Sequence, residues 1–496
     1  MSKIARRSFL KKSMATVAGT GLGSALLTGC SNLPASSWSR VKGANDDIRI
    51  GIAGMRKQGI VHIDQYSKVS GVRIVALCDC DTQFIGAQVD RLKSANIEVE
   101  TYVDIRKMLD DPNIDAVSLP IPDHWHALAA IWACQAGKDV YVEKPMAYSI
   151  WEGRKMVEAA RKYQRIVAAG SQERSDTGLI AAAESIKNGD LGKVKYMHAI
   201  SYSPRQSIGK VNGPQIIPAT CDYNLFQGPA PMEPLMRTSL HYDWHWYWPT
   251  GTGEIGNLGG HVLDDCRWMT GLDKVPQKAI SLGGRWGYVD DGQTPNTQIS
   301  YYEYPTPIIY EIRGIPQQMG MRGMGQGQRY KGINFGLVIQ CEEGYFAGGR
   351  GGGWTYDNQG NRIKQFPGDS GGGHMANFRD AVRSRKYTDL KADVLEGHIS
   401  AAMPFMANVS YRLGRQETPE KIKEIIGDNE LLQESFSRMI QYLEENKINI
   451  EQSPITIGPV LTMDLQKEQF TGEYSDMANI FVKRDFREPF VIPDNV

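Results

Sequence analysis

Lys144 and His261 are the residues of this chain whose types and surroundings best suit chemistry on a bound ligand. Lys144 stands between Glu143 and Pro145, directly after the apolar run 139–142, so it lies where a strand ends. Open parallel sheets bind ligands outside the carboxyl ends of their strands. Removing hydride from a carbinol needs a base near the hydroxyl and a positive group for the developing alkoxide. A histidine and a lysine supply those two functions.

An isolated E-K-P tripeptide is more often a surface turn with an ion pair. Here a nucleotide-binding pattern upstream favours the ligand-binding interpretation. The strand-like run Ile48–Ala53 leads into Gly54, Met55 and Arg56, and Gly59 completes G-x-G-x-x-G with arginine at the second glycine. The first glycine permits a tight turn, the third lets helix and strand approach, and the helix N-terminus binds pyrophosphate. With arginine at the second glycine position, pyrophosphate can bind in this way only if the Arg56 side chain turns away from the loop.

Asp79 strengthens the dinucleotide interpretation. It ends the second predicted strand, 20 residues after Gly59, where an acid accepts hydrogen bonds from the adenosine ribose. A carboxylate there repels a 2′-phosphate and favours NAD over NADP, while Arg56 and Lys57 keep NADP as a minor alternative. A strand-end turn residue is the other interpretation of Asp79.

Pro122 and His126 follow the predicted strand Ala116–Leu119. Asp123 is predicted to cap the next helix, which would place His126 in its first turn, facing the cleft. A satisfied structural histidine is an equally good interpretation of His126.

Strand-like and helix-like segments alternate up to about residue 170, which predicts right-handed parallel crossovers. Longer alternating stretches then predict antiparallel strands. We therefore expect an α/β plus α+β chain: an N-terminal Rossmann domain with a doubly wound parallel sheet, and a C-terminal domain with a large, mostly antiparallel open sheet. The expected boundaries are 47–170 for the nucleotide domain, 171–415 for the substrate and oligomerisation domain, and 416–496 for a C-terminal extension.

The predicted strands are Ile48–Ala53, Val72–Cys78, Ala116–Leu119, Val140–Val142, Ile166–Ala169, Val194–Tyr202, Lys278–Gly283, Thr297–Tyr304, Ile308–Gly314 and Phe335–Cys341. The predicted helices are Gly59–Val69, Thr82–Ala95, His124–Ala136, Ile150–Tyr163, Thr177–Asn188, His374–Arg383 and Val394–Leu413. The glycine-rich pieces 319–327, 348–353 and 371–373 are predicted to be loops, a lid or a subunit arm. From Gln416 we expect helix up to Asn446 and irregular chain beyond it.

The composition indicates a soluble globular protein of more than one domain. The 496 residues exceed what a single core accommodates, and Lys+Arg and Asp+Glu both number 56, so the formal net charge is zero. Nucleic-acid-binding proteins carry a basic stripe, and none appears beyond the extreme N-terminus. The 7 cysteines show no metal-ligand spacing, so no metal site is predicted, and buried free thiols are favoured over disulfides.

The N-terminal residues have the pattern of an export signal. A basic start and the apolar stretch Met14–Leu27, too short to span a bilayer, predict a signal peptide over residues 1–30. The run 6–11 resembles a twin-arginine signal, and Leu27–Cys30 resembles a bacterial lipobox that implies lipid attachment at Cys30. Residues 31–46 would form the linker. The expected location is periplasmic or cell-envelope, with a lipid anchor as the membrane contact.

The order of these motifs, with Glu143-Lys144-Pro145 followed by G-x-H-x-x-D, resembles the Gfo/Idh/MocA oxidoreductases, from about Ile48 to Arg415. The resemblance implies that Lys144 hydrogen-bonds the substrate hydroxyl and the nicotinamide ribose. His261 would be the acid–base group. The family usually has an acid four residues before that histidine, where this chain has Asn257. The resemblance also implies a homodimer or homotetramer.

Three further groups of residues are assigned from this framework. Asp264, one helical turn beyond His261, lies on the face where it would assist that histidine, and a packing role is equally expected. Gln172 and Arg174 resemble substrate-side residues of the family. Trp246 belongs to an aromatic run that would form a carbohydrate wall or a packing cluster.

Three alternative functions are compatible with these residues. The first is an oxidoreductase that transfers hydride between a sugar, glycoside or cyclitol hydroxyl and a tightly bound NAD. The second is an NAD-dependent glycoside hydrolase or lyase that oxidises its sugar transiently. The third is a catalytically silent sugar- or nucleotide-binding lipoprotein, which Arg56 and Asn257 would support. Intact Lys144 and His261 argue against the third, and the retained Glu143-Lys144-Pro145 motif favours the first over the second.

Overall fold

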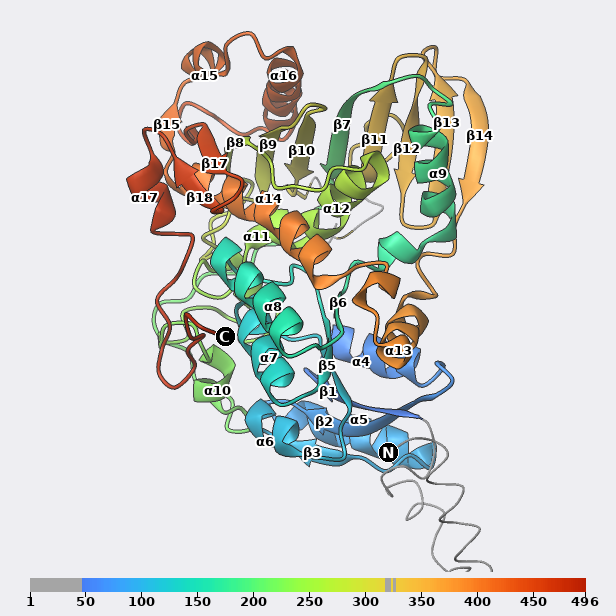
Figure 1. The fold of residues 1–496 in the computed structure, drawn as a ribbon. Helices are drawn as coiled ribbons and strands as arrows, with labels where there is room; N and C mark the ends of the chain where they lie inside the picture. The colour runs from blue at the N-terminus through green and yellow to red at the C-terminus, as the bar shows by residue number, and fades with distance from the viewer. Residues whose placement is uncertain (1–46, 317–322, 324–326) are drawn as a thin grey trace, which may run out of the picture.

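The computed structural model describes residues 47–316, 323 and 327–496. The predicted signal peptide 1–30 with Cys30, the linker 31–46 and most of the segment 319–327 lie outside the described residues. Two sheets organise the rest of the chain, a parallel one near the N-terminus and a larger one above it in Figure 1. The predicted fold class is therefore confirmed.

The first sheet has the strand order β3-β2-β1-β4-β5-β6, and all of its described pairings are parallel. β1, β4 and β5 are buried along their whole length, as expected for parallel strands covered on both faces. The strands are β1 (Ile48–Ala53), β2 (Val72–Cys78), β3 (Glu100–Tyr102), β4 (Ala116–Leu119), β5 (Asp139–Val142) and β6 (Val167–Ala169).

The helices of this domain are α4 (Lys57–Tyr66), α5 (Gln83–Ser94), α6 (Ile105–Asp110), α7 (Asp123–Gln135) and α8 (Ile150–Lys162). β3 and α6 were not predicted. β3 has only three residues, two of them exposed, so it carries no apolar pattern. Asp123 was expected to cap α7, but Pro122 holds the cap position and Asp123 is the first helical residue.

The second sheet runs β14-β13-β12-β11-β7-β10-β9-β8-β16-β15, and β17 pairs with β8 and β18. Its described pairings are antiparallel except between β7 and β10. The strands are β7 (Val194–Ser201), β8 (Lys278–Gly284), β9 (Thr297–Glu303), β10 (Ile308–Arg313), β11 (Phe335–Cys341), β12 (Gly344–Gly349), β13 (Gly352–Asp357), β14 (Arg362–Pro367), β15 (Arg415–Glu417), β16 (Ile455–Ile457), β17 (Leu461–Asp464) and β18 (Gln469–Thr471).

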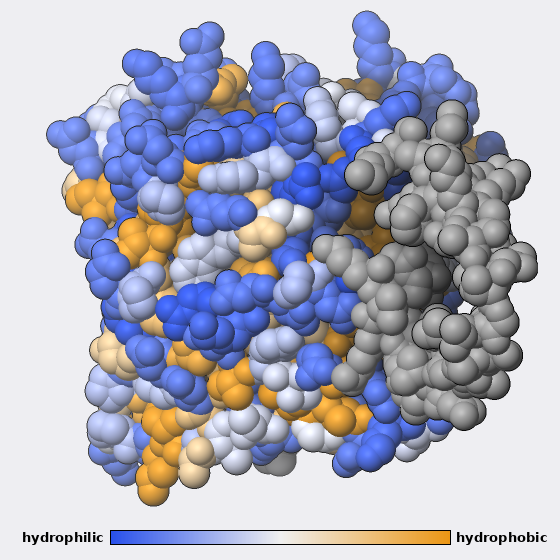
Figure 2. All heavy atoms as spheres, turned by 60° about the horizontal axis from the view of Figure 1, so that its bottom comes forward, coloured by the Kyte–Doolittle hydropathy of each residue, from blue (hydrophilic) through white to orange (hydrophobic). Residues whose placement is uncertain are grey.

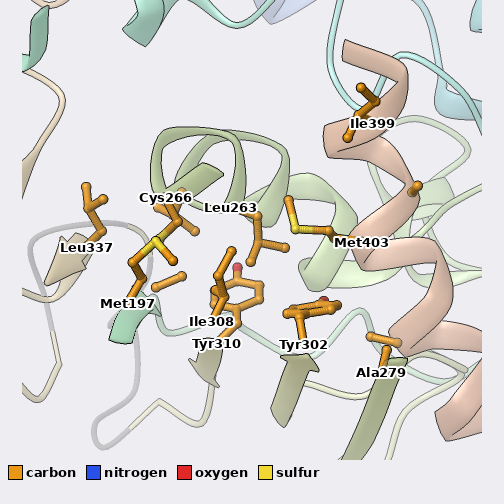
Figure 3. Packing of buried hydrophobic residues seen from close by; sticks show 14 of the residues in the cluster. Met197, Leu263, Cys266, Ala279, Tyr302, Ile308, Tyr310, Leu337, Ile399 and Met403 are labelled. Carbon is orange, nitrogen blue, oxygen red and sulfur yellow. The ribbon is translucent and has the colours of Figure 1, made fainter. Parts of the chain in front are cut away.

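The helices α9 (Thr177–Lys187), α12 (Gly259–Thr270) and α14 (Val394–Arg412) pack against this sheet, as does the later helix 430–445. Figure 3 shows Leu263 of α12 and Met403 of α14 lying over Tyr302 and Tyr310 of the sheet. Burial of these side chains fixes α12, and α12 carries His261. Among the described helices, none combines the length and apolar character that crossing a bilayer requires.

Two predictions about the second domain are wrong. The segment 348–353, expected to be a loop, forms the ends of β12 and β13 and the tight turn between them. The chain beyond Asn446, expected to be irregular, contributes β16, β17 and β18, and β16 joins β8 to β15. The helical stretch before it divides into α15 (Pro419–Ile426) and α16 (Glu430–Glu445). Residues after 415 thus complete the large sheet.

The face seen when the lower end of Figure 1 is turned forward is mainly hydrophilic, with small apolar areas between polar ones (Figure 2). The remaining described elements are short: η1 (Gln172–Ser175), α10 (Tyr223–Gln227), η2 (Asp243–Trp246), α11 (Gly253–Asn257), α13 (His374–Ser384), η3 (Tyr387–Asp389) and α17 (Ser475–Asn479). Of these, η1, η2 and α11 border the cavity described next.

Candidate active site

A cavity of about 1510 Å³ lies between the strand ends of the parallel sheet and the second domain. It exceeds the range of roughly 300–1,000 Å³ that a single small ligand usually occupies. The predicted site residues that line it are Gly54, Arg56, Asp79, Pro122, His126, Glu143, Lys144, Gln172, Trp246, Asn257 and His261. Met55, Gly59, Arg174 and Asp264 do not line it. The cavity therefore has room for a cofactor together with a substrate.

The glycine loop needs glycine at two of its positions. Gly54 has a φ of +94°, and a Cβ there would meet the Pro120 carbonyl oxygen at 2.4 Å. A Cβ on Gly59 would lie 1.8 Å from the Gly54 carbonyl oxygen, so the third glycine permits the close approach of helix and strand. Arg56 has a φ of −91°, which any residue adopts, and its guanidinium lies 4.9 Å from the centre of the Phe84 ring. The backbone at Arg56 therefore has a conformation that does not require glycine.

Asp79 lies at the end of β2, where the sequence placed it. Its carboxylate accepts hydrogen bonds from the backbone N–H groups of Met55 (2.7 Å) and Asp81 (2.9 Å), and burial raises its pKa. Met55 itself is buried in the core of the nucleotide domain, so only its backbone contributes here. Asp79 thus fixes the glycine loop while remaining on the cavity wall, as binding of an adenosine ribose requires.

His126 presents an acceptor to the cavity. Its Nδ1 is 2.7 Å from the Pro145 carbonyl oxygen, to which it donates, and burial lowers its pKa to about 4, so the ring is neutral. Its Nε2 is buried and has no hydrogen-bond partner among the described residues. An orphaned acceptor on the cavity wall fits a ligand that donates there, such as the carboxamide of nicotinamide. With the glycine loop and Asp79, this shows that the residues present fit a dinucleotide.

Lys144 reaches across to the second domain. Its Nζ donates to the backbone carbonyl oxygen of Asn257 at 2.6 Å and lies 3.5 Å from the side-chain oxygen of the same residue. Its stem passes Gly260 so closely that a Cβ there would lie 3.1 Å from Lys144 Cδ. Burial lowers the pKa of Lys144. The lysine is therefore held beside His261, the next residue after Gly260.

Glu143 lines the cavity and holds the backbone of Lys144. Its Oε1 accepts from His62 Nε2 at 2.9 Å and from Gln58 Nε2 at 3.0 Å, while Oε2 accepts from the backbone N–H of Lys144 at 3.2 Å. Burial opposes its ionisation, but His62 and its other donors lower its pKa to about 2. Glu143 is thus a fixed anion behind the lysine.

His261 finds its carboxylate on another element. Its Nδ1 lies 3.5 Å from Oε1 of Glu173, which belongs to η1, whereas Asn257 is engaged with Lys144. The guanidinium of Arg350, in the turn between β12 and β13, also donates to Glu173 Oε1, at 3.1 Å. Burial lowers the pKa of His261 well below its usual value, and the charges of Lys144 and Arg350 act in the same direction. The imidazole is therefore a neutral base.

Asp264 does not assist His261. Its carboxylate binds Arg174 through two hydrogen bonds of 2.8 Å and accepts from Ser400 at 2.5 Å. Arg174 and Asp264 are both almost completely buried, so Arg174 is not a substrate-side residue. Because Asp264 lies three residues after His261 in α12, the two were expected to share a face, but Asp264 turns to the ion pair behind the cavity. The pair anchors η1, which carries Glu173.

The remaining predicted residues lie on the cavity wall. Gln172 places its amide beside the Arg350 guanidinium. Trp246 is buried and packs with Ile208 and Tyr247, and one side of it lines the cavity. Its neighbours Tyr242, Trp244 and His245 line the cavity too. The aromatic run therefore serves both as a wall and as packing.

Sequence reasoning missed Glu173, Arg350 and Asp123. Glu173 follows the end of β6 by four residues, a position that a strand-end argument had already used for Gln172 and Arg174. Arg350 lay in a segment interpreted as flexible, so nothing pointed to it. Asp123 lines the cavity, accepts from Thr252 Oγ1 at 2.6 Å, and has its pKa raised to about 6 by burial.

The fold and this site define an oxidoreductase with a dinucleotide-binding domain. Comparison with known families agrees: the profile described as oxidoreductase family, NAD-binding Rossmann fold, matches residues 48–171. The profile described as oxidoreductase family, C-terminal alpha/beta domain, matches residues 201–331, and the two together cover more than half of the chain. The chain belongs to the Gfo/Idh/MocA oxidoreductase family.

Curated relatives match about a third of the chain. The chain is 32% identical over 176 residues to glycosyl hydrolase family 109 protein 2 of Shewanella sp. (strain ANA-3), a match that covers 33% of this chain and 39% of that protein. It is 29% identical over 172 residues to inositol 2-dehydrogenase of Salmonella typhimurium, covering 34% of this chain and 50% of that protein. The chain thus matches half or less of the length of these relatives.

Solved structures share the fold across most of the chain. The WlbA dehydrogenase from Bordetella pertussis, solved with NADH and UDP-GlcNAcA, has a TM-score of 0.52 at 17% identity and covers 73% of this chain and 96% of its own. An oxidoreductase from Agrobacterium radiobacter, solved with NAD+, L-tartaric acid and magnesium, has a TM-score of 0.54 at 14% identity and covers 73% and 95%. At these identities the likeness concerns the fold.

We expect Asp79→Ala to weaken NAD binding by about tenfold or more, because it removes a charged acceptor that also fixes the glycine loop. NADP binding should weaken less, since the lost carboxylate no longer repels a 2′-phosphate. Calorimetric titration of each nucleotide into the purified protein measures both constants. Asp90→Ala, on the exposed face of α5, is the matched control and should leave them unchanged. Equal losses for the two nucleotides would contradict the assignment of Asp79 to the ribose.

Proposed function

We propose that this protein is a nicotinamide-dependent oxidoreductase that acts on a hydroxyl-bearing carbon of a carbohydrate. The observation that carries the proposal is the meeting of Lys144 and His261 on one wall of a cavity whose other end is a dinucleotide cradle. The lysine comes from the nucleotide domain and the histidine from the substrate domain. A substrate lying between the domains would touch both.

The residues divide the chemistry between them. A nicotinamide cofactor held by the glycine loop and Asp79 would supply the acceptor for the hydride of the substrate C–H bond. His261, which is neutral because burial lowers its pKa, takes the proton of the substrate hydroxyl. The ammonium of Lys144 stabilises the developing negative charge on that oxygen. Asn257 keeps the ammonium in place through its backbone carbonyl.

A carbohydrate suits the remaining wall. Tyr242, Trp244 and Trp246 present aromatic surface, against which the C–H faces of sugars pack, next to polar groups of Asn257 and Gln172. The cavity volume leaves room for a substrate beside the cofactor. The names of the curated relatives, an inositol dehydrogenase and a glycosyl hydrolase, point to the same substrate class.

NAD is the proposed cofactor in preference to NADP. Asp79 stands where a 2′-phosphate would be placed, and no described guanidinium or ammonium forms an ion pair with it. Arg56 lines the same end of the cavity, so NADP is the alternative. We propose that NAD is retained between turnovers, because an exported enzyme would meet little free NAD.

A second candidate is a glycoside hydrolase that oxidises its sugar transiently. Oxidation next to a C–H bond acidifies that bond and lets a glycosidic bond break, and the cofactor then returns to its starting state. The similarity to glycosyl hydrolase family 109 protein 2 supports this candidate. It needs the same Lys144 and His261, so the products distinguish the two.

The function is tested with protein purified without added nucleotide. We expect an absorbance band of bound nicotinamide that grows in its reduced form when one sugar of a panel of monosaccharides, glycosides and cyclitols is added, with a keto-sugar as product. Cleavage of a glycoside with no lasting reduced band would favour the hydrolase. Absence of bound nucleotide even after incubation with NAD or NADP would contradict both candidates.

Lys144→Ala is expected to lower kcat by at least about 10²-fold while NAD stays bound, because the charge that stabilises the oxyanion is lost. The measurements are kcat from the reduced-cofactor band and NAD content after gel filtration. Lys187→Ala, exposed on α9, is the matched control. Unchanged turnover in Lys144→Ala would remove the lysine from the mechanism.

His261 should set an acid limb in the pH profile of kcat/KM. Only its neutral form accepts a proton, so the rate should fall as pH drops through its pKa, which burial places well below the ordinary value. The wild type should therefore keep full activity below pH ~6.5, the unperturbed value. His261→Gln should lose about 10²-fold or more in rate and lack this limb. A limb that persists in the variant would belong to another group.

We also propose that the protein is exported and anchored through a lipid on Cys30. Cys30→Ser should move the protein from the membrane fraction to the soluble fraction after cell lysis, because the thiol that carries the lipid is lost. Immunoblots of the two fractions measure this. Cys80→Ser, within the folded domain, is the control and should leave the protein in the membrane fraction. An unchanged distribution for Cys30→Ser would contradict the anchor.

A further inference from the structure

Behind His261 lies a group of buried polar atoms with no hydrogen-bond partners among the described residues. They are Nδ1 of His261, Oε2 of Glu173 and both carboxyl oxygens of Asp265. Glu173 is 1% exposed and Asp265 is 0% exposed. Buried polar atoms are nearly always paired, so four orphaned atoms in one place require a physical account.

The two acids come from different elements that pack together. Glu173 lies on η1, and Asp265 lies on α12, four residues after His261. Burial raises the pKa of the Asp265 carboxyl well above its usual value, and its interaction with the Glu173 carboxyl acts in the same direction. Two ionised carboxylates offer only acceptors, so they repel each other and no hydrogen bond forms. One proton placed between them turns the repulsion into a strong O–H···O hydrogen bond.

The charged groups around Glu173 and Asp265, counted together with these two acids, leave one negative charge, which one proton would neutralise. The guanidinium groups facing this region are those of Arg174, Arg267 and Arg350. Arg174 binds Asp264 and Glu396, and Arg267 binds Glu396, so both are committed to other carboxylates. Arg350 alone serves Glu173, and it donates to the oxygen that faces His261. Three cations therefore face four carboxyl groups.

A bound metal is not the partner that this geometry indicates. In the described part of the chain, no three His, Cys, Asp or Glu side chains are grouped so as to hold a metal ion. Lys144 donates to Asn257 and not to the acids. A proton remains as the charge that satisfies Glu173 and Asp265 together.

We propose that Glu173 and Asp265 share one proton, and that this pair accepts the proton which His261 removes from the substrate hydroxyl. The inference rests on the proposed function. The hydroxyl proton moves to His261 Nε2, the proton on Nδ1 moves to Glu173, and the acid pair changes from one negative charge to none. No atom is lost: the hydride goes to the nicotinamide and the proton stays in the protein. Glu173 and Asp265 are positioning and proton-accepting residues, since neither touches the substrate.

Such a pair would let the enzyme retain both parts of the hydrogen it removes. In the return half of the cycle, the same steps run backwards, and His261 delivers the stored proton to the new hydroxyl oxygen. A site closed to water then needs no proton from solvent in either half. This matches a cofactor that is itself retained between the two halves.

Infrared spectroscopy tests the shared proton without any substrate. At a pH well above the ordinary carboxyl pKa of about 4, wild-type protein should show the C=O band of a neutral carboxyl group that Glu173→Gln and Asp265→Asn both lack. Each amide donates one hydrogen bond to the remaining carboxylate, so the variants should keep the fold, which thermal unfolding checks. Asp90→Asn, on exposed α5, should retain the band. A wild-type protein without such a band overturns the proposal even if the variants fail to fold.

Proton release during a single turnover tests the uptake. With sugar in excess and a pH-indicator dye, the wild type should release well under one proton per reduced cofactor, and Glu173→Gln should release close to one. Equal release by the two proteins overturns the uptake step. If no sugar reduces the cofactor, the proposed function and the uptake fail together, while the infrared band still decides whether the pair shares a proton.

Discussion

The hydrogen bond from Lys144 to the backbone carbonyl of Asn257 is the contact on which the site depends. A buried ammonium is costly unless its donors are satisfied, and here the acceptor belongs to the other domain. The carbonyl lies at the C-terminal end of α11, which orients it toward the cation. Neighbouring contacts reinforce the same junction: Asp123 of α7 accepts from Thr252, and the Thr252 carbonyl accepts from Asn408 of α14. Lys144 and His261 therefore come together where the two domains meet.

The helix α12 contributes side chains both to the cavity and to the buried ion pair behind it. α12 presents His261 to the cavity and Asp264 to Arg174, while Asp265, the next residue, turns toward Glu173. The Arg174–Asp264 ion pair is fully buried, and its many hydrogen bonds offset the cost of removing both charges from water. Because Arg174 and Glu173 are consecutive in η1, this pair also fixes the carboxylate beside His261. An ion pair outside the cavity thus fixes the position of the carboxylate next to His261.

The sequence predicted the parallel sheet well because its strands are buried on both faces and read as apolar runs bounded by glycine and proline. Gly54, Asp79 and Lys144 were found for the same reason, because they directly follow the ends of such strands. The partners of those residues were not predictable, because they depend on contacts between distant segments. Glu173 meets His261 across 88 positions, and Arg350 reaches it from a glycine-rich turn. The late strands β16 and β17 were missed because short strands carry little periodicity.

The family resemblance predicts an acid at position 257, and the asparagine found there changes how charge is distributed in the site. An aspartate there would place a carboxylate about as near to Lys144 Nζ as the amide oxygen, which is 3.5 Å away. Such an ion pair would raise the pKa of the lysine and neutralise the charge that the oxyanion needs. With asparagine, neutral oxygens hold the lysine, and burial keeps its pKa low. The carboxylate beside the histidine comes from η1 instead. The lysine is thereby held by neutral oxygens while the carboxylate lies beside the histidine, so neither charge neutralises the other directly.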